Sequence, residues 1–248
     1  MSAFFHEALY RPLLNLLFLI YGFISSDLGI AIIIMTIIIR FILLPIFYKS
    51  AKDQTIMQKL APKIREIQKK HKDNKEQQTR EMMAMYKEHQ VNPFSSIGLL
   101  LLQLPILWTL YRLFLGGFGD AVITQLYSFV PHPESVNYMF LNSIALNEKN
   151  TLLVIIAAVF QFLQTFLLMR VARKNTTMDT DNPAMAAAQK MSQRMMYFMP
   201  ILTVFILSGL PSAIALYWLT TSAFSTVQQL IINKKLQKND QGGNVSGN

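Results

Sequence analysis

The sequence predicts an all-α, polytopic membrane protein with five transmembrane helices, and two observations support this fold class. First, 52% of the 248 residues are apolar although the mean hydropathy is only +0.31, so the apolar residues must gather in blocks. Second, these blocks have the length of about 20 residues that a helix needs to cross a bilayer. They lie at residues 28–48, 94–115, 151–169 and 197–232.

The last block is long enough to hold two spans. It is interrupted by a cluster of turn-forming residues, which would let it fold back with a tight outer loop: Ser208, Gly209, Pro211 and Ser212. We therefore expect spans at residues 28–48, 93–115, 151–170, 197–210 and 211–232. The segments around them are expected to be an external amphipathic helix (1–27), a cytoplasmic helical hairpin (49–92), an external loop (116–150), a cytoplasmic loop (171–196) and a short basic cytoplasmic tail (233–248).

The N-terminal segment has an apolar run, residues 13–24, that is short for a span. No small-residue cleavage site follows it, so it does not resemble a signal peptide. We expect an interfacial helix on the outer surface. The alternative is a sixth span with the N-terminus inside, and Ser25, Ser26 and Asp27 would then have to form the whole connecting turn.

The distribution of charge orients the chain, because loops rich in Lys and Arg stay in the cytoplasm. Residues 49–92 hold eleven basic residues against six acids, residues 170–194 five against two, and the tail three against one. The N-terminal segment and the loop at 116–150 are both net acidic. We therefore expect the N-terminus outside and the C-terminus in the cytoplasm. The net charge of +9 needs no nucleic-acid partner to explain it.

The segment between the first two spans has helical patterning. One apolar face is formed by Ile56, Met57, Leu60, Ile64 and Ile67, and a second by Thr79, Met82, Met83 and Tyr86. This pattern predicts two antiparallel helices, the first kinked or restarted near Pro62. They would form either a solvated linker or a mobile platform for a cytosolic partner such as ribosomal RNA or anionic headgroups.

Arg40 is the one charge well inside a predicted span. An arginine at the centre of a membrane helix costs at least about 2.5–3.5 kcal/mol on insertion scales. Its side chain cannot reach the headgroups at Lys49, which lies nine residues or about 13 Å further along the helix. The predicted spans also contain no acid for it to pair with. We therefore expect a hydrophilic recess that brings water from the cytoplasm to Arg40.

Other predicted spans carry polar side chains that could line such a recess. These residues are Gln103, Gln161, Gln164, Thr165, Tyr217, Thr221, Ser225 and Gln228. Each alone is typical of ordinary hydrogen bonding between membrane helices. Together with Arg40 they favour a shared cavity.

The predicted spans lack the side chains that proton-coupled pumps, intramembrane proteases and thiolate metal sites use. All four histidines and every carboxylate lie outside them, and the chain has no cysteine. A proton-coupled pump, an intramembrane protease and a thiolate metal site are therefore not expected. We expect no catalytic residue, no metal and no cofactor.

Three stretches of the chain resemble a known family. They are TIIIRFILLPIF with KLAPKIREIQKKH, then MMAMYKEHQVNPFSSIGLLLLQLPILWTLYRLF, and finally MMYFMPILTVFILSGLPSAIALYWLTTSAFSTVQQLII. In order and spacing they resemble the YidC/Oxa1/Alb3 membrane protein insertases, over about residues 28–232. The resemblance is to the short form, which has no large periplasmic domain.

The resemblance implies five helices around a groove that is open to the cytosol and to lipid but closed on the outer side. Arg40 corresponds to the family's groove arginine, Gln164 and Trp218 to groove-lining positions, and Tyr217 to a frequent tyrosine. The implied partners are nascent membrane proteins, the ribosome, the Sec translocon, the signal recognition particle receptor and the phospholipid bilayer. The implied location is the bacterial plasma membrane, with an organelle membrane as the alternative.

The expected function is therefore that of an insertase and chaperone, not of an enzyme. Hydrophilic segments of nascent membrane proteins would pass through the charged groove, and their helices would then be released into lipid. The alternative is a passive channel or small-molecule transporter that uses the same cavity.

Overall fold

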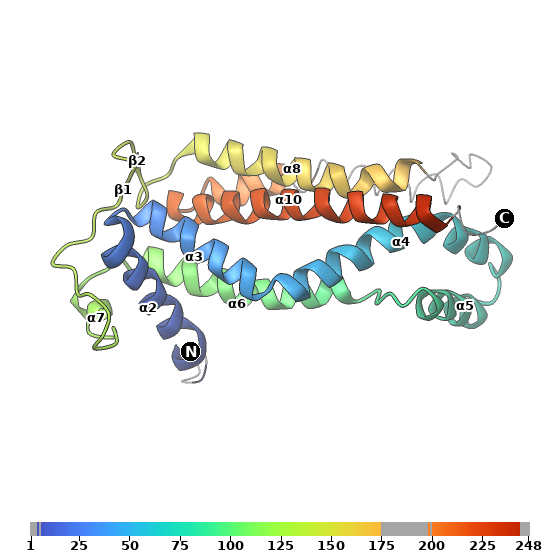
Figure 1. Ribbon diagram of the computed structural model, residues 1–248, viewed down its shortest axis with the longest axis horizontal. Coiled ribbons are helices and arrows are strands. Elements are labelled where there is room, and N and C mark those ends of the chain that lie inside the picture. Colours follow the sequence, from blue (N-terminus) through green and yellow to red (C-terminus); the bar gives the residue numbers. More distant parts are fainter. Residues whose placement is uncertain (1–3, 5, 175–197, 199, 244–248) are drawn as a thin grey trace. The chain divides into compact units, whose positions relative to one another are not determined.

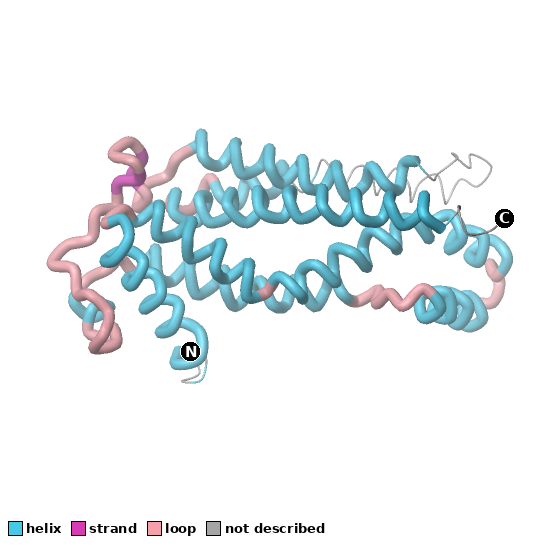
Figure 2. The backbone as a smooth tube through the Cα atoms, viewed as in Figure 1, coloured by secondary structure: helices cyan, strands magenta, loops and turns pink. Residues whose placement is uncertain are grey.

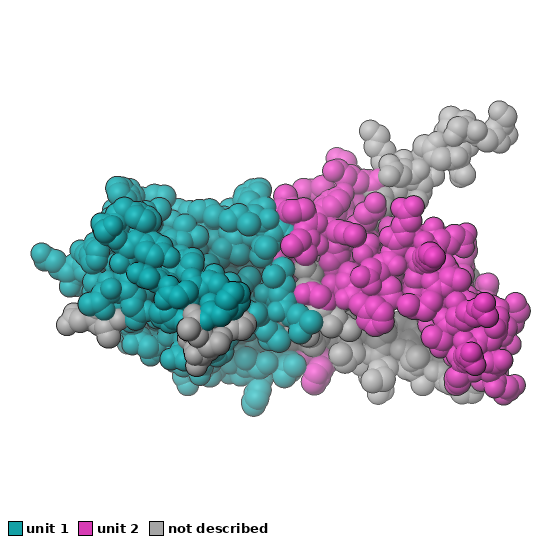
Figure 3. Space-filling view, turned by 90° about the horizontal axis from the view of Figure 1, so that it is seen from below, with its two compact units in different colours: residues 1–43, 100–161, 200–224 teal, residues 44–99, 162–199, 225–248 magenta. Residues whose placement is uncertain are grey.

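The computed structural model describes residues 4, 6–174, 198 and 200–243. Nearly all of these residues outside residues 116–150 are helical, as Figure 2 shows, which confirms the helical class. The chain forms two compact units (Figure 3). The first comprises residues 1–43, 100–161 and 200–224, and the second comprises residues 44–99, 162–199 and 225–248.

The first unit begins with a continuous helical segment. A π-helical turn (His6–Tyr10) leads into α2 (Arg11–Ile20) and a second π-helical turn (Tyr21–Ser25). Ser26 then adopts a left-handed conformation with φ of 48°, and Asp27 caps α3 (Leu28–Ile42) by accepting hydrogen bonds from the N–H groups of Gly29 and Ile30 at 2.8 and 3.0 Å.

The connection between this segment and α3 is as short as the six-span alternative requires. Within the described residues, His6–Ile24 is also the one helix long and apolar enough by itself to cross a membrane. Its placement on the outer surface or across the bilayer therefore stays a prediction.

The first predicted span, residues 28–48, is not one continuous helix. It breaks at Leu43, and α4 (Leu44–Lys70) begins with Pro45 in its first turn. Within a continuing helix, the ring of Pro45 would clash with the carbonyl of Phe41, whereas the first turn tolerates proline. The expected restart at Pro62 is wrong, because α4 runs through that residue.

In the second unit, α4 packs against α5 (Lys75–Glu88). Asn74 caps α5 by accepting a hydrogen bond from the Gln77 N–H at 2.9 Å. The small apolar core of this pair consists of Leu60, Ile64 and Val91, with Ile56, Met57, Met82, Met85 and Tyr86 packed against it. Met83, expected on this face, is instead 45% exposed, because Met82, Met85 and Tyr86 share a side of α5 at helical spacing.

Three further helices are long: α6 (Ser95–Leu115), α8 (Thr151–Lys174) and α10 (Ser212–Gly243). Residues 200–207 are also helical, and residues 208–211 connect them to α10. Residues 197 and 199 of the predicted fourth span lie outside the described part of the chain.

Two of these helices expose apolar side chains at spacings of three and four residues, which places them on one face. On α6 the exposed residues are Leu101, Leu104, Trp108, Tyr111 and Leu115, and on α8 they are Leu152, Ile155, Val159, Leu163 and Phe166. Among the residues whose side chains the structure describes, the apolar helical stretches Leu101–Leu115 and Thr151–Leu167 have fewer than 18 residues each. A helix with such a stripe is suited to contact with lipid.

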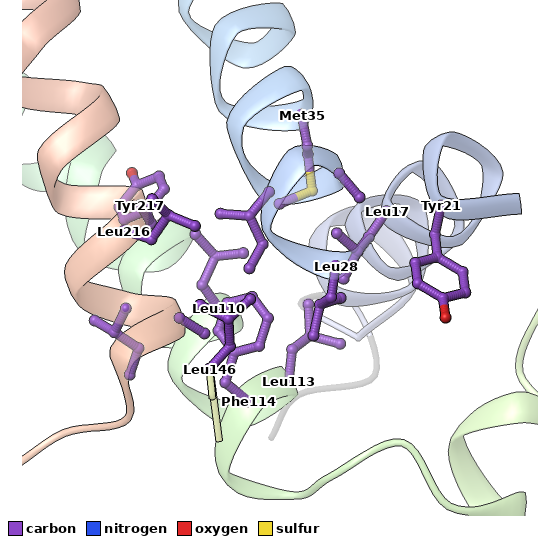
Figure 4. Close-up of a cluster of buried hydrophobic side chains, with 14 of the residues drawn as sticks. Leu17, Tyr21, Leu28, Met35, Leu110, Leu113, Phe114, Leu146, Leu216 and Tyr217 are labelled. Atoms are coloured by element: carbon purple, nitrogen blue, oxygen red, sulfur yellow. The ribbon is translucent and has the colours of Figure 1, made fainter. Parts of the chain in front are cut away.

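The core of the first unit joins the N-terminal helices to the later ones. Figure 4 shows side chains of α2, α3, α6 and α10 meeting, with Leu17, Met35, Leu110 and Leu216 among them. Leu146, from the loop at 116–150, is fully buried in the same cluster. These buried side chains hold the helices of the unit together by close packing, which is the interaction that stabilises helix contacts inside a membrane.

The loop at residues 116–150 is structured. It contains α7 (Asp120–Ile123) and an antiparallel pair of short strands, β1 (Met139–Phe140) and β2 (Ile144–Ala145), which lies beside the start of α3 in Figure 1. Several hydrogen bonds connect the loop to helices, and three of them involve residues at helix ends. The Leu141 N–H donates to Asp27 Oδ2 at 2.8 Å, the Asn137 N–H to Tyr21 Oη at 3.0 Å, and the Ser212 N–H to the Glu148 carbonyl at 2.7 Å.

A Gly29→Ala substitution should loosen this loop. A Cβ atom at Gly29 would lie 2.2 Å from Phe140 Cδ2 and 2.8 Å from Phe140 Cβ, so the β1 backbone must move. Such overpacking typically costs about 1–3 kcal/mol. We expect a lower midpoint of thermal unfolding in detergent and faster hydrogen exchange at residues 139–145.

The matched control is Gly98→Ala in α6, where a Cβ meets nothing within 4 Å. This change should be neutral or stabilising, since alanine favours a helix over glycine by about 0.5–1 kcal/mol. Equal stability of both variants would contradict the close packing of Phe140 on Gly29.

Candidate functional site

Arg40 lies near the end of α3, where protein atoms surround it. It is 6% exposed, so its guanidinium does not face the lipid side of the helix. Its charge interacts electrostatically with Tyr217 of α10, in the same unit. Thr36, one turn earlier on α3, is also buried and donates a hydrogen bond to the Ile32 carbonyl at 2.6 Å. This stretch of α3 therefore presents polar groups to the interior of the first unit.

Tyr217 of α10 is hydrogen-bonded to α6. Its side chain is 2% exposed, and its hydroxyl accepts a hydrogen bond from the Gln103 amide. Thr221 follows one helical turn later on α10, with its hydroxyl oxygen buried. We call Arg40, Gln103, Tyr217 and Thr221 the Arg40 cluster.

A second polar group, the Gln161 cluster, forms around the other predicted residues of the first unit. Gln161 Oε1 accepts hydrogen bonds from Trp218 Nε1 at 2.8 Å and from Thr203 Oγ1 at 2.7 Å. Thr203 is 5% exposed and was not expected from the sequence, where it is a single hydroxyl in an apolar run. Trp218 directly follows Tyr217, so the two clusters occupy neighbouring faces of α10, about 100° apart.

Gln164 belongs to the second unit and lines a cavity there of about 220 Å³. The polar residues around this cavity come from α4, α8 and α10, and we call the space the amide cavity. They are Gln54, Gln164, Thr165, Ser225, Gln228 and Gln229. Four of these six were predicted as recess residues. Gln54 was missed because it lies in the polar segment between the first two predicted spans, and Gln229 because it lies next to Gln228 and off the face that the predicted residues share.

The groups in these three places are suited to binding by hydrogen bonds and charge. The Arg40 cluster offers one positive charge together with amide and hydroxyl groups, and the Gln161 cluster and the amide cavity offer only uncharged hydrogen-bonding groups. Among the described residues, no group of three or more His, Asp or Glu side chains is arranged to hold a metal ion.

Removing the hydrogen-bond acceptor in Gln161→Leu should leave the indole N–H of Trp218 unsatisfied. An unpaired buried donor costs about 1–3 kcal/mol. In a Trp108→Phe background, where Trp218 is the remaining tryptophan, we expect shifted fluorescence emission and a lower unfolding midpoint.

The control for this prediction is Gln164→Leu, the same change about one turn further along α8. It should leave Trp218 emission unchanged. Identical spectra for the Gln161 variant and the parent would show that the hydrogen bond does not form.

One family model and several curated proteins match most of this chain, and the proteins share the description membrane protein insertase. The family model described as 60Kd inner membrane protein matches residues 19–239. The chain is 33% identical over 219 residues to the membrane protein insertase YidC of Oceanobacillus iheyensis, covering 87% of this chain and 78% of that protein. It is 29% identical over 239 residues to the membrane protein insertase MisCB of Bacillus subtilis, covering 92% and 80%.

Other relatives are much longer than this chain. The similarity to the membrane protein insertase YidC of Wolinella succinogenes is 30% identity over 227 residues. This alignment covers 92% of the chain but only 37% of that relative. The chain thus spans a little over a third of the length of such proteins.

Proposed function

We propose that this chain, which belongs to the YidC/Oxa1 family of 60Kd inner membrane proteins, is a membrane protein insertase. The observation that carries the proposal is the family match over residues 19–239, which includes both polar clusters and the amide cavity. Proteins of this family are polytopic proteins of the inner or plasma membrane, and the chain is therefore one as well. It would act without catalysing a reaction and without a cofactor.

The proposed architecture is five spans around a hydrophilic groove that opens to the cytoplasm and to lipid. The exposed apolar stripes of α6 and α8 support spans there, because lipid is a suitable neighbour for such surfaces. The basic segments at 49–92 and 171–196 support a cytoplasmic position for the connections, with the N-terminus outside. The loop at 116–150 is held by hydrogen bonds to the ends of helices, which supports a groove that is closed on the outer side.

In this proposal the Arg40 cluster acts on the hydrophilic segment of a substrate. A carboxylate 4 Å from Arg40 would gain about 4 kcal/mol at an effective dielectric constant of 20, which offsets a membrane insertion penalty of similar size. Gln103 and Tyr217 add uncharged hydrogen-bonding groups beside that charge. The attraction is temporary, because the substrate's apolar helix gains more by leaving into lipid.

The proposed groove residues are Arg40, Gln103, Gln161, Gln164, Tyr217, Trp218 and Thr221. The α4 and α5 pair, with its excess of basic residues, is proposed to meet the ribosome at the membrane surface. The Sec translocon and the signal recognition particle receptor are further proposed partners.

Arg40→Ala should reduce insertion of substrates with acidic translocated tails. We expect a loss of about ten-fold, equivalent to 1.4 kcal/mol, for a single-span substrate with such a tail in liposomes that contain the purified protein. Arg40→Lys should keep most of the activity, because it keeps the charge.

The same liposomes separate insertion from transport. Insertion of the substrate without flux of small solutes supports an insertase, whereas flux without insertion would indicate a channel or transporter. Equal insertion by the wild type and both variants would contradict the electrostatic role of Arg40.

A further inference from the structure

The amide cavity differs chemically from the Arg40 cluster. The side chains that provide its hydrogen-bonding groups are all uncharged, four of them glutamines, and Phe47 and Ala51 supply apolar wall. Because the lining carries no full charge, it does not select for substrate charge of either sign. Its volume of about 220 Å³ would hold about seven water molecules at about 30 Å³ each, which is room for a short piece of polypeptide.

One lining group in the amide cavity has unused hydrogen-bonding capacity. Gln228 is 7% exposed, and its Oε1 has no hydrogen-bond partner in the described part of the protein. A buried amide oxygen without a donor is unfavourable and uncommon. Its neighbour Gln229, in contrast, donates to Thr55 Oγ1 at 2.9 Å and to Asn233 Oδ1 at 3.0 Å. A rotation of the Gln228 side chain toward the cavity that it lines would satisfy this oxygen by offering it to a ligand that brings an N–H or O–H donor.

We propose that the amide cavity binds the peptide backbone of a substrate's hydrophilic segment, without regard to side-chain charge. A peptide group has one N–H donor and one C=O acceptor, and a glutamine amide can pair with either. Backbone N–H groups occur in every hydrophilic segment except at proline, so such a site accepts varied sequences. This inference rests on the proposed insertase function and adds to it a second, charge-independent contact.

The proposal separates the two sites by substrate. Loss of Arg40 should harm acidic tails more than neutral ones, because it removes a charge. Loss of the cavity's amides should harm acidic and neutral tails by the same factor, because the backbone is common to both. A proline-rich tail should be nearly insensitive, because it has few N–H donors to give to the Gln228 oxygen, the group in the cavity that lacks a partner.

The test uses the double variant Gln164→Leu with Gln228→Leu, reconstituted in liposomes with three single-span substrates. Their translocated tails are acidic, serine- and asparagine-rich, or proline-rich, and are otherwise identical. We expect the double variant to insert the first two about five-fold less well than wild type, the effect of about one hydrogen bond, and the third nearly as well as wild type. The matched control is Gln58→Leu, a half-buried glutamine of α4 outside the cavity lining, which should insert all three like wild type.

A second measurement keeps the test valid if the double variant unfolds. Replacing Phe47, which is 8% exposed and lines the cavity, with the photoreactive benzoylphenylalanine should crosslink to the tail of a stalled substrate. Crosslinks to phospholipid alone, or none, would overturn the inference, as would insertion of all three substrates at wild-type levels by a folded double variant. If the wild type inserts no substrate, the insertase proposal itself fails, and this inference with it.

Discussion

The cost of keeping Arg40 charged inside an apolar helix is the constraint on which the rest of this protein depends. A guanidinium in the centre of a membrane costs several kcal/mol unless protein dipoles or water replace its hydration. Arg40 is almost fully buried by protein, and Tyr217 lies within electrostatic range of it. Polar groups of α6 and α10 lie in the same unit as this charge, and in the proposed mechanism they form with it a site for hydrophilic segments.

The helix α10 organises both kinds of polar contact. Tyr217 and Trp218, adjacent in sequence, connect to Gln103 and Gln161 on different neighbouring helices. Further along the same helix, Gln228 and Gln229 line the amide cavity. In the proposed mechanism, one helix therefore presents a substrate with a charge-selective contact and a charge-independent one.

Much of the helical plan could be predicted from the sequence, because apolar blocks and turn-forming residues are local signals. The predicted starts of the helices at Leu28 and Thr151 coincide with those of α3 and α8. The break at Leu43 was missed, although Pro45 is its visible cause, and so was the paired β1 and β2 segment, which depends on distant contacts with Asp27 and Gly29. The pairing of Gln161 with Thr203 was also missed, because periodicity places a residue on a face but does not identify its partner.

Water contact at Arg40 is the most direct test of the central claim. Protein with ¹⁵N-labelled arginine in bilayers can be studied by water-edited solid-state NMR, and the Arg40→Lys variant identifies the Arg40 signal. We predict measurable magnetisation transfer from water to the Arg40 guanidinium, slower than to that of Arg80, an exposed residue of α5, because Arg40 is only 6% exposed. Transfer from lipid acyl chains alone, with none from water, would contradict the hydrated groove.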